Sequence, residues 1–356
     1  MIADLQSSKT IYDLASLLEI PAKTLAFLLY KLPDDKKYHE KSLSKKGGGT
    51  RVIKAPDYRL KELQRKLSDL LYTCQSEIGE SHAQRRSFGF ERNVGIYENA
   101  LSHANKRWVF NIDLLDFFPS INFGRVRGYF CKNADFSLEP RIATLISQIA
   151  CHDNSLPQGA PSSPVISNLI CGSLDYRLSK LAKRALCNYS RYVDDITFST
   201  NQKNFPDLIA IETSDPQGWA VSDELVARIC GAGFLINPSK TRMSFRRSRQ
   251  VVTGLVVNSK PSVKREFYKN TRATIHRMMR GQPWSLERFS DPFRLNCENE
   301  EVQTDEFSAI EGRIAFAYQL DDKKDRRKAS AKFFHPTGVA RTYSNLLFMK
   351  YFTNLG

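Results

Sequence analysis

The sequence lacks the cysteine patterns that build zinc sites or disulfide frameworks. It contains seven cysteines, an odd number, and no two of them stand in Cys-x-x-Cys spacing. Disulfide-bonded extracellular domains and zinc-binding modules are therefore not expected. We expect a reducing compartment, the cytoplasm, in which most of these thiols act as small buried hydrophobic groups.

The sequence also lacks an apolar run long enough to span a bilayer. Its first eight residues do not have the basic and then apolar arrangement of a signal peptide, and no long repeat or low-complexity tract follows. Secretion and a membrane partner are therefore not expected. A length of 356 residues, 41% of them hydrophobic, predicts a globular protein of two or three substructures.

Acidic residues are few relative to basic ones. Lys and Arg number 53, Asp and Glu number 38, and the formal net charge is +15. Between Lys240 and Arg280 the only acid is Glu266, against twelve basic residues. A solvated basic face is one interpretation of this segment. The concentration of charge favours a surface that binds a polyanion, most commonly nucleic acid.

Hydrophobic periodicity predicts an α+β fold in which helices back a sheet. The predicted strands cover residues 52–56, 107–112, 188–193, 196–200 and 251–258, and the predicted helices cover 58–72, 164–185 and 224–232, with short helices in 10–32. Asp113 directly follows one predicted strand, and Asp194 and Asp195 lie at a hairpin tip between two others. Acidic side chains are thus expected at the ends of strands.

Carboxylates crowded at strand ends repel one another unless a cation lies between them. Asp113, Asp116, Asp194 and Asp195 have this placement. Mg²⁺ takes oxygen ligands and bridges substrate phosphates, and a pair of such ions supports phosphoryl transfer. An Asp-Asp pair alone is more typical of an ordinary turn. The surrounding motifs must therefore decide between the two interpretations.

Several ordered segments resemble the motifs of reverse transcriptases, over about residues 45–260. Residues 111–121 resemble motif A, and residues 156–164 resemble motif B. Residues 191–195 resemble motif C, residues 233–241 motif D, and residues 45–56 and 87–90 the fingers blocks. Any one of these matches is weak, but their order and spacing together are specific.

Two further elements resemble bacterial retron reverse transcriptases. Residues 99–103 fit the Asn-Ala-x-x-His element, and residues 252–254 fit the Val-Thr-Gly element. Alone, the first is typical of a helix face and the second of a turn at a strand end. We see no maturase-type DNA-binding domain or zinc-nuclease module after residue 260, which disfavours the group II intron lineage.

The resemblance implies an α+β right-hand polymerase. The expected parts are an N-terminal helical extension at 1–40, fingers at 41–105 with 125–163, a palm at 106–124 and 164–260, and a basic thumb at 261–356.

By the same resemblance, Asp113, Asp194 and Asp195 are the catalytic carboxylates and the ligands of Mg²⁺. Asp113 and Asp194 are expected to be the closer ligands. Asp116 lies in the segment expected to touch the incoming triphosphate. Phe118 stands where the family places a bulky residue that clashes with a ribose 2′-hydroxyl and favours deoxynucleotides, although a plain core role is the alternative.

The remaining nucleotide contacts are also implied by the resemblance. Gln158 is expected to contact the sugar and triphosphate. Lys46 and Arg51 are candidates for the β- and γ-phosphates, because basic side chains neutralise them and the arginine fork binds their oxygens bidentately. Lys240 is expected to donate a proton to pyrophosphate, with an ordinary surface lysine as the alternative.

RNA contacts are expected in two places. Asn99 and His103 lie four residues apart, on one helix face, and either contact RNA or form a buried hydrogen-bonded pair. The Val-Thr-Gly element contributes Val252, Thr253 and Gly254, and the basic C-terminal lobe contributes Arg265, Lys269 and Arg272.

The resemblance implies RNA-directed DNA synthesis from dNTPs on the protein's own structured noncoding RNA. Priming from an RNA 2′-hydroxyl would give a branched RNA–DNA hybrid, used in antiphage defence with a separate effector protein. The alternatives are another bacterial reverse transcriptase of intron or abortive-infection type, a catalytically silent RNA-binding scaffold, and a metal-dependent nuclease. Intact Asp113, Asp194 and Asp195 argue against the scaffold, and Gln158 with an aromatic Phe118 argues against the nuclease.

Overall fold

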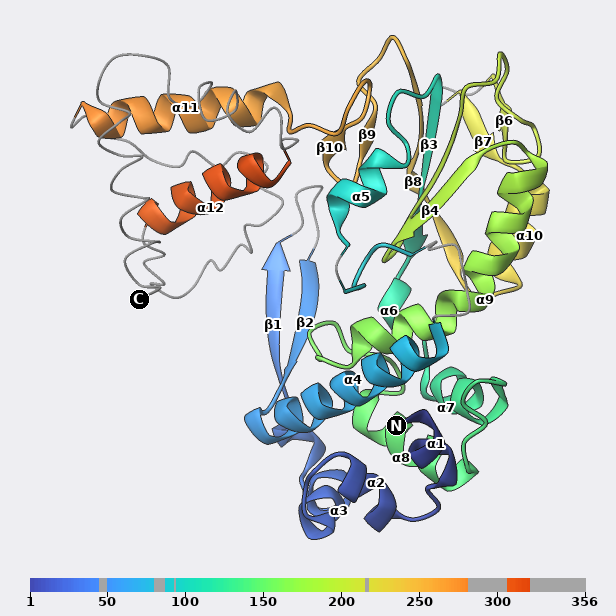
Figure 1. Ribbon diagram of the computed structural model, residues 1–356, viewed down its shortest axis with the longest axis vertical. Helices are drawn as coiled ribbons and strands as arrows, with labels where there is room; N and C mark the ends of the chain where they lie inside the picture. Colours follow the sequence, from blue (N-terminus) through green and yellow to red (C-terminus); the bar gives the residue numbers. More distant parts are fainter. Residues whose placement is uncertain (45–49, 80–86, 93, 215–217, 281–305, 321–356) are drawn as a thin grey trace.

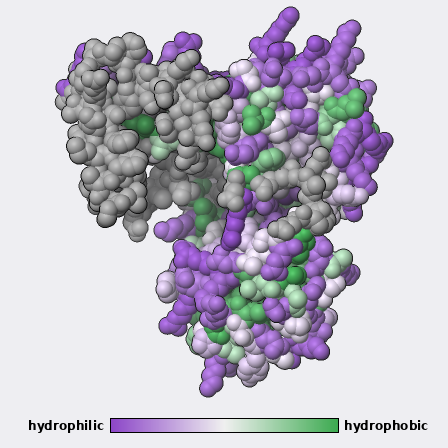
Figure 2. Space-filling model, in the orientation of Figure 1, coloured by the Kyte–Doolittle hydropathy of each residue, from purple (hydrophilic) through white to green (hydrophobic). Residues whose placement is uncertain are grey.

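A computed structural model describes residues 1–44, 50–79, 87–92, 94–214, 218–280 and 306–320 of the chain. Hydrophilic residues dominate the coloured surface in Figure 2, as the composition of the chain leads one to expect. Within the described ranges, no helix combines the length and the apolar character that a bilayer-spanning segment needs.

A four-stranded antiparallel sheet forms the upper part of the molecule in Figure 1. Its strands, in spatial order, are β4 (Asn188–Tyr192), β5 (Asp195–Thr200), β3 (Trp108–Leu115) and β8 (Leu235–Phe245). β3 pairs with β5 on one side and with β8 on the other. Its aromatic and branched residues are mostly buried, as a central strand requires.

Two helices pack against this sheet. α9 (Ser163–Arg184) lies along β4, and α10 (Asp223–Cys230) packs against α9 and β8. Pro164 fits the first turn of α9 because a backbone N–H is not needed there. The Ser222 hydroxyl caps α10 by accepting a hydrogen bond from the backbone N–H of Leu225. Local sequence therefore fixes where both helices begin.

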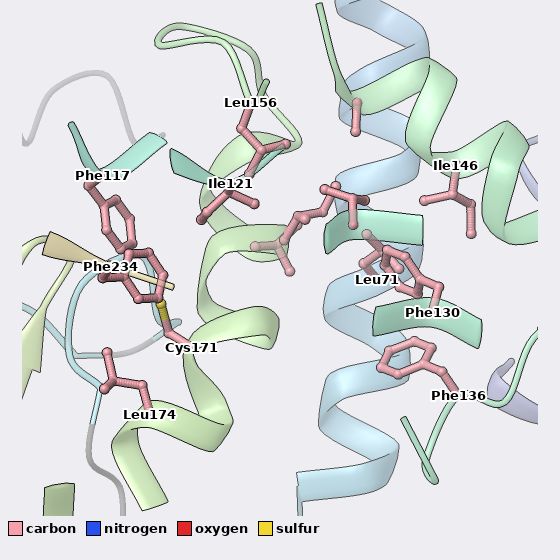
Figure 3. Close-up of a cluster of buried hydrophobic side chains, with 14 of the residues drawn as sticks. Leu71, Phe117, Ile121, Phe130, Phe136, Ile146, Leu156, Cys171, Leu174 and Phe234 are labelled. Carbon is pink, nitrogen blue, oxygen red and sulfur yellow. The ribbon is translucent and has the colours of Figure 1, made fainter. Parts of the chain in front are cut away.

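A helical unit lies below the sheet in Figure 1. It comprises α1 (Ile2–Ser7), α2 (Ile11–Leu17), α3 (Ala22–Tyr30), the short 3₁₀ helix η1 (Asp34–Lys36), α4 (Tyr58–Gly79), α7 (Phe123–Lys132) and α8 (Pro140–Ala150). Leu71 of α4, Phe130 of α7 and Ile146 of α8 belong to one buried cluster, with Phe136 beside them (Figure 3). The same cluster continues into the sheet, so the helical unit and the sheet share a core.

The described fold also includes the short helix α5 (Ile96–Leu101), two hairpins beside the main sheet and helical unit, and two C-terminal helices. β1 (Tyr38–Ser44) and β2 (Thr50–Pro56) form a hairpin that extends away from α4 (Figure 1), and β6 (Ala210–Glu212) pairs with β7 (Trp219–Val221). α11 (Arg265–Met279) packs against α12 (Glu306–Gln319), with the rings of Phe267 and Phe316 5.9 Å apart.

The α+β class predicted from periodicity is confirmed, although the bounds of several elements differ from the prediction. The motif A strand, β3, continues through Asp113 to Leu115 instead of ending at residue 112. The strand expected at 251–258 is instead a small hairpin of β9 (Val251–Val252) and β10 (Leu255–Val256), because Thr253 and Gly254 both have positive φ.

Strand β8 was not predicted. Its residues 235–245 include a proline and two charged side chains, Lys240 and Arg242, and just over half of them are exposed on this edge strand of the sheet. A proline and charged residues are tolerated at edges, where they blunt the unpaired backbone. The hydrophobic alternation that reveals a half-buried strand is therefore weak in this segment.

Candidate active site

Three aspartates from separate parts of the chain meet at one end of the sheet. Asp113 lies on β3 opposite Asp195 of β5, and Asp194 lies in the turn between β4 and β5. One carboxylate oxygen from each of the three lies within 4.8 Å of the others. Among the described residues, this is the only cluster of His, Cys, Asp or Glu with the geometry of a metal site.

The turn that carries Asp194 is strained and closely packed. Val193 has φ of 59°, a left-handed conformation that is unusual for a β-branched residue and costs about 1–3 kcal/mol. Leu114 of β3 donates its backbone N–H to the Asp194 carbonyl at 3.0 Å. A Cβ on Gly89 would lie 2.6 Å from the Val193 nitrogen, so only glycine fits there. Surrounding contacts therefore hold the turn in a conformation it would not adopt alone.

Asp113 is nearly buried and already has two polar partners. Its side chain is 9% exposed. Lys240 Nζ lies 3.0 Å from Asp113 Oδ2, and the amide of Asn237 donates to Oδ1 at 3.1 Å. The Lys240 side chain is 56% exposed, so its ammonium reaches the acids from the solvent side. The positive charge placed beside the three acids is thus a flexible and replaceable one.

Asp195 is destabilised in its ionised form. Partial desolvation by the surrounding protein and the negative charges of Asp194 and Asp113 raise the pKa of Asp195 to about 7, although the side chain keeps access to solvent. A divalent cation between the carboxylates would remove this repulsion. Three carboxylates also supply the hard oxygen ligands that Mg²⁺ and similar ions take. The residues present therefore fit a divalent metal.

Phe118 lies in the short helix that follows β3, between two other rings. It is half-buried, at 5.2 Å from the buried Phe117 and 6.2 Å from the partly exposed Phe90. Phe117 in turn stacks on Phe234 in the core (Figure 3). Asp116 is exposed and precedes the short helix α6 (Phe117–Ser120), with φ of 43°. Phe117 is thus the buried core member, and Phe118 packs against the same core with its side chain only half-buried.

The motif B loop is joined to the β1–β2 hairpin. Lys54 of β2 donates its backbone N–H to the Gln158 carbonyl at 2.9 Å. Gly159 has φ of 115°, and a Cβ there would lie 2.9 Å from the Lys54 carbonyl oxygen. This close approach requires glycine. Lys46 lies outside the described residues, as does the side chain of Arg51.

The Asn-Ala-x-x-His element is buried. The His103 ring contacts two hydroxyls at 2.7 Å each, Ser199 at Nδ1 and Ser190 at Nε2. The Ser190 hydroxyl donates to Asn99 Oδ1 at 2.5 Å, so it accepts from His103 Nε2–H. Burial lowers the pKa of His103 to about 3, and the ring is neutral. These contacts fit a buried hydrogen-bonded pair, so direct RNA contact through these two side chains is not what the structure supports.

The remaining residues expected to bind RNA are distributed over two places. In the Val-Thr-Gly turn, Val252 is buried and Gly254 is exposed, while the Thr253 hydroxyl donates to the Ile96 carbonyl at 3.3 Å and lies 3.4 Å from the Asn99 amide. The turn is therefore fixed to the helix that carries Asn99. A second group, Arg265, Lys269 and Arg272, lies exposed along α11.

Some residues that shape the site have no sequence signal of their own. Asn237 precedes a proline in motif D and reads as a turn residue, yet it hydrogen-bonds Asp113. Arg191 and Asp175 are charged residues that composition places at the surface, yet both are buried. Asp175 on the buried face of predicted helix 164–185 was the available clue, because a buried charge needs a partner.

Comparison with known proteins assigns the fold and the class of enzyme. A family model described as reverse transcriptase (RNA-dependent DNA polymerase) matches residues 43–274. The chain belongs to this family, and it is an RNA-directed DNA polymerase with the right-hand fold. RNA is accordingly its template.

Within that family, the curated relatives are retron reverse transcriptases. The chain is 32% identical over 320 residues to the retron Ec86 reverse transcriptase of Escherichia coli, covering 89% of this chain and 86% of that protein. It is 30% identical over 327 residues to the retron Ec73 reverse transcriptase of E. coli, covering 87% and 91%. The resemblance to retron enzymes inferred from the sequence is therefore confirmed.

A solved structure of telomerase from Candida albicans, in complex with a fragment of telomeric RNA, has a similar arrangement of elements. The TM-score is 0.47 and the sequence identity 11%, with 89% of this chain and 60% of that chain covered. At this score the likeness adds nothing to the family assignment.

Proposed function

We propose that the protein is a Mg²⁺-dependent retron reverse transcriptase that copies part of its own structured noncoding RNA into DNA from dNTPs. Synthesis would start from a 2′-hydroxyl of that RNA and give a branched RNA–DNA product, used in antiphage defence with a separate effector protein. The observation that carries the catalytic part is the cluster of Asp113, Asp194 and Asp195 within 4.8 Å. The retron names of the relatives support the rest.

Asp113, Asp194 and Asp195 are the proposed ligands of the metal ions. When bound, a pair of ions would activate the attacking hydroxyl and steady the pyrophosphate leaving group. Asp113 and Asp194 are held by backbone pairing on both sides of β3, so their carboxylates have defined positions. Asp195, whose ionised form is disfavoured, is the looser ligand.

Lys240 is the proposed proton donor to the pyrophosphate. Its ammonium lies beside the acids and on their exposed side, at 3.0 Å from Asp113 Oδ2. A metal ion that binds the carboxylate would replace this contact and free the ammonium to approach the leaving group. Its long flexible stem allows that movement without a change in the backbone.

Phe118 is the proposed selector of deoxynucleotides, with Asp116 and Gln158 beside the incoming triphosphate. The ring of Phe118 is braced by Phe117 and Phe90, so it has little freedom to yield to a ribose 2′-hydroxyl. Gln158 is fixed through its backbone to β2, the strand that also carries Arg51. Lys46 and Arg51 are the proposed contacts of the terminal phosphates.

The proposed RNA surface includes the exposed stripe of α11. Arg265, Lys269 and Arg272 are spaced by four and three residues, so they share one face of the helix. Thr253 and Gly254 form the turn between β9 and β10, which we propose as a second contact to RNA. We propose that the RNA template is enclosed by three parts of the chain. They are the fingers (41–105 with 125–163), the palm (106–124 and 164–260) and the thumb (261–356). Location in the cytoplasm stays a prediction.

The nucleic acid that copurifies with the expressed protein and its RNA tests this proposal. We expect DNA that remains attached to RNA after denaturation and that is released only when a 2′,5′-phosphodiester is cleaved. An unbranched product primed from a 3′-hydroxyl would favour an intron-type or abortive-infection enzyme. RNA without any DNA would favour a silent scaffold, for which an Asp194→Asn variant supplies the matched reference.

A further inference from the structure

A buried ion pair lies directly behind the turn that carries Asp194. The Arg191 side chain is 0% exposed and the Asp175 side chain 7% exposed. Arg191 Nε donates to Asp175 Oδ1 at 2.8 Å, and Nη2 donates to Oδ2 at 2.8 Å. This is the two-bond fork geometry in which arginine binds a carboxylate most specifically. Asp175 belongs to α9, which runs along β4 (Figure 1).

The third nitrogen of the same guanidinium contacts the turn itself. Arg191 Nη1 donates to the Val193 carbonyl at 3.0 Å. On the other side of the turn, the Leu114 N–H donates to the Asp194 carbonyl at 3.0 Å. The backbone on either side of Asp194 Cα is thus held by the Arg191 fork and by β3. Because Val193 has φ of 59°, such restraints are what keep the turn in place.

The pair is also connected to the segment that packs over the turn. The Asn168 side chain accepts from the Arg191 guanidinium at 3.3 Å and donates to the Gly89 carbonyl at 2.7 Å. The backbone N–H of Phe88 donates to the Arg191 carbonyl at 2.9 Å. Gly89 lies against Val193. One buried arginine therefore joins α9, the turn and residues 87–89.

We propose that Arg191 is a positioning residue of the polymerase: its guanidinium, locked by Asp175, fixes the Val193–Asp194 turn so that the two turn carboxylates face Asp113. This inference rests on the proposed role of Asp194 and Asp195 as metal ligands. A buried pair on its own is weak evidence for stability, because desolvation offsets the attraction. An apolar pair of the same size could fill the space, but it could not donate the hydrogen bond that Arg191 gives to the Val193 carbonyl.

The test separates positioning from folding. In the triple variant Arg191→Met, Asp175→Leu, Tyr189→Phe, apolar side chains replace the pair, and the third change removes the Tyr189 hydroxyl that donates to Asp175 at 2.7 Å. Such a replacement leaves no unpaired buried charge and is often neutral for stability. The control is Tyr189→Phe alone, which removes one contact of Asp175 and leaves the Arg191 bond to Val193.

We expect the triple variant to fold and to bind RNA as the unaltered protein does. Its kcat for dNTP incorporation on a primed RNA template should fall on the order of 10- to 100-fold, because small displacements of reacting groups cost this much. The Mg²⁺ concentration for half-maximal activity should rise. The Tyr189→Phe control should keep both values. A triple variant with unchanged kcat and Mg²⁺ dependence would overturn the inference.

A second variant decides the case if the triple variant does not fold. Arg191→Lys keeps a positive charge opposite Asp175, but a single ammonium lacks the fork that reaches both the carboxylate and the Val193 carbonyl. It should show the same loss in kcat and Mg²⁺ dependence, and unchanged values would overturn the inference. Asp194→Asn is measured alongside. If this variant retains DNA synthesis, the proposed assignment of the metal ligands is wrong. If it is inactive while Arg191→Lys is fully active, only the positioning role of Arg191 is wrong.

Discussion

Two aspartates of the sheet region, Asp175 and Asp113, each face one cation at hydrogen-bond distance, and the two pairs differ in exposure and geometry. Arg191 and Asp175 are both buried and share two bonds. Lys240 has a 56% exposed side chain and contacts Asp113 with one ammonium at 3.0 Å. The buried arginine, with two hydrogen bonds, is difficult to displace from Asp175. The exposed lysine, with one contact, is easy to displace from Asp113. If Asp113 binds a metal ion as proposed, it must exchange Lys240 for that ion, and the exposed lysine is the partner that is easier to displace.

The largest difference between the pairs should appear in stability. Arg191→Met leaves the Asp175 carboxylate buried without its cation, which typically costs about 3–5 kcal/mol of the free energy of unfolding. Lys240→Met breaks a solvent-exposed contact, which typically costs less than about 1 kcal/mol. Urea denaturation of both variants measures this. Equal losses would show that the burial of the first pair has no energetic consequence.

The exposed pair should matter for catalysis and little for stability. If Lys240 donates a proton to the leaving pyrophosphate, Lys240→Met should lower the single-turnover rate about 100-fold while RNA affinity is unchanged. The matched control is Arg247→Met, which removes an exposed cation beyond the end of β8 and should retain the rate within a few-fold. A Lys240→Met enzyme at the full rate would leave this lysine as an ordinary surface residue.

Two adjacent phenylalanines show a similar contrast, because Phe117 is buried and Phe118 is only half-buried. Phe117→Ala empties a core position and should cost about 3 kcal/mol of stability. Phe118→Ala should cost less stability and should lower the preference for dNTPs over rNTPs by about tenfold or more. Competition assays with paired nucleotides measure this preference. Unchanged sugar selectivity would remove the proposed role of Phe118.

The smallest expected effect is on metal-induced stabilisation. Because the folded-state pKa of Asp195 is raised to about 7, ionising this carboxylate costs stability as pH rises toward that value. Mg²⁺ binds the ionised form, so it should raise the melting temperature more at about pH 8 than at about pH 6. Asp195→Asn should abolish that difference. An equal rise at both pH values would mean that Asp195 is not part of the metal site.

The motifs in the sequence located the three acids because each follows or interrupts a hydrophobic strand. The Asp194-Asp195 pair could be assigned to a hairpin tip from local pattern alone, whereas Asp113 lies within β3 and not after its end as predicted. The family resemblance supplied the convergence of the three. The register that sets Asp113 opposite Asp195 depends on pairing between distant strands. No local pattern fixes such pairing, so the distances required the structure.

Other features were out of reach of the sequence for identifiable reasons. The edge strand β8 is hard to recognise because Pro238 and the polar residues around it interrupt the hydrophobic alternation. Asn99 lies on the helix 96–101, but His103 lies in the turn just after it and not on the helix face expected from the sequence. Whether the two side chains meet RNA or the core depends on Ser190 and Ser199, which come from two later strands. Arg191 reads as a surface residue until Asp175 is placed beside it.

The most direct measurement is primer extension on an RNA template by Asp194→Asn, compared with the unaltered protein at equal RNA occupancy. We expect dNTP incorporation to disappear while RNA affinity stays within a few-fold, because the substitution removes a metal-binding charge and retains the shape of the turn. Undiminished DNA synthesis by this variant would contradict the assignment of the three-aspartate cluster as the catalytic centre.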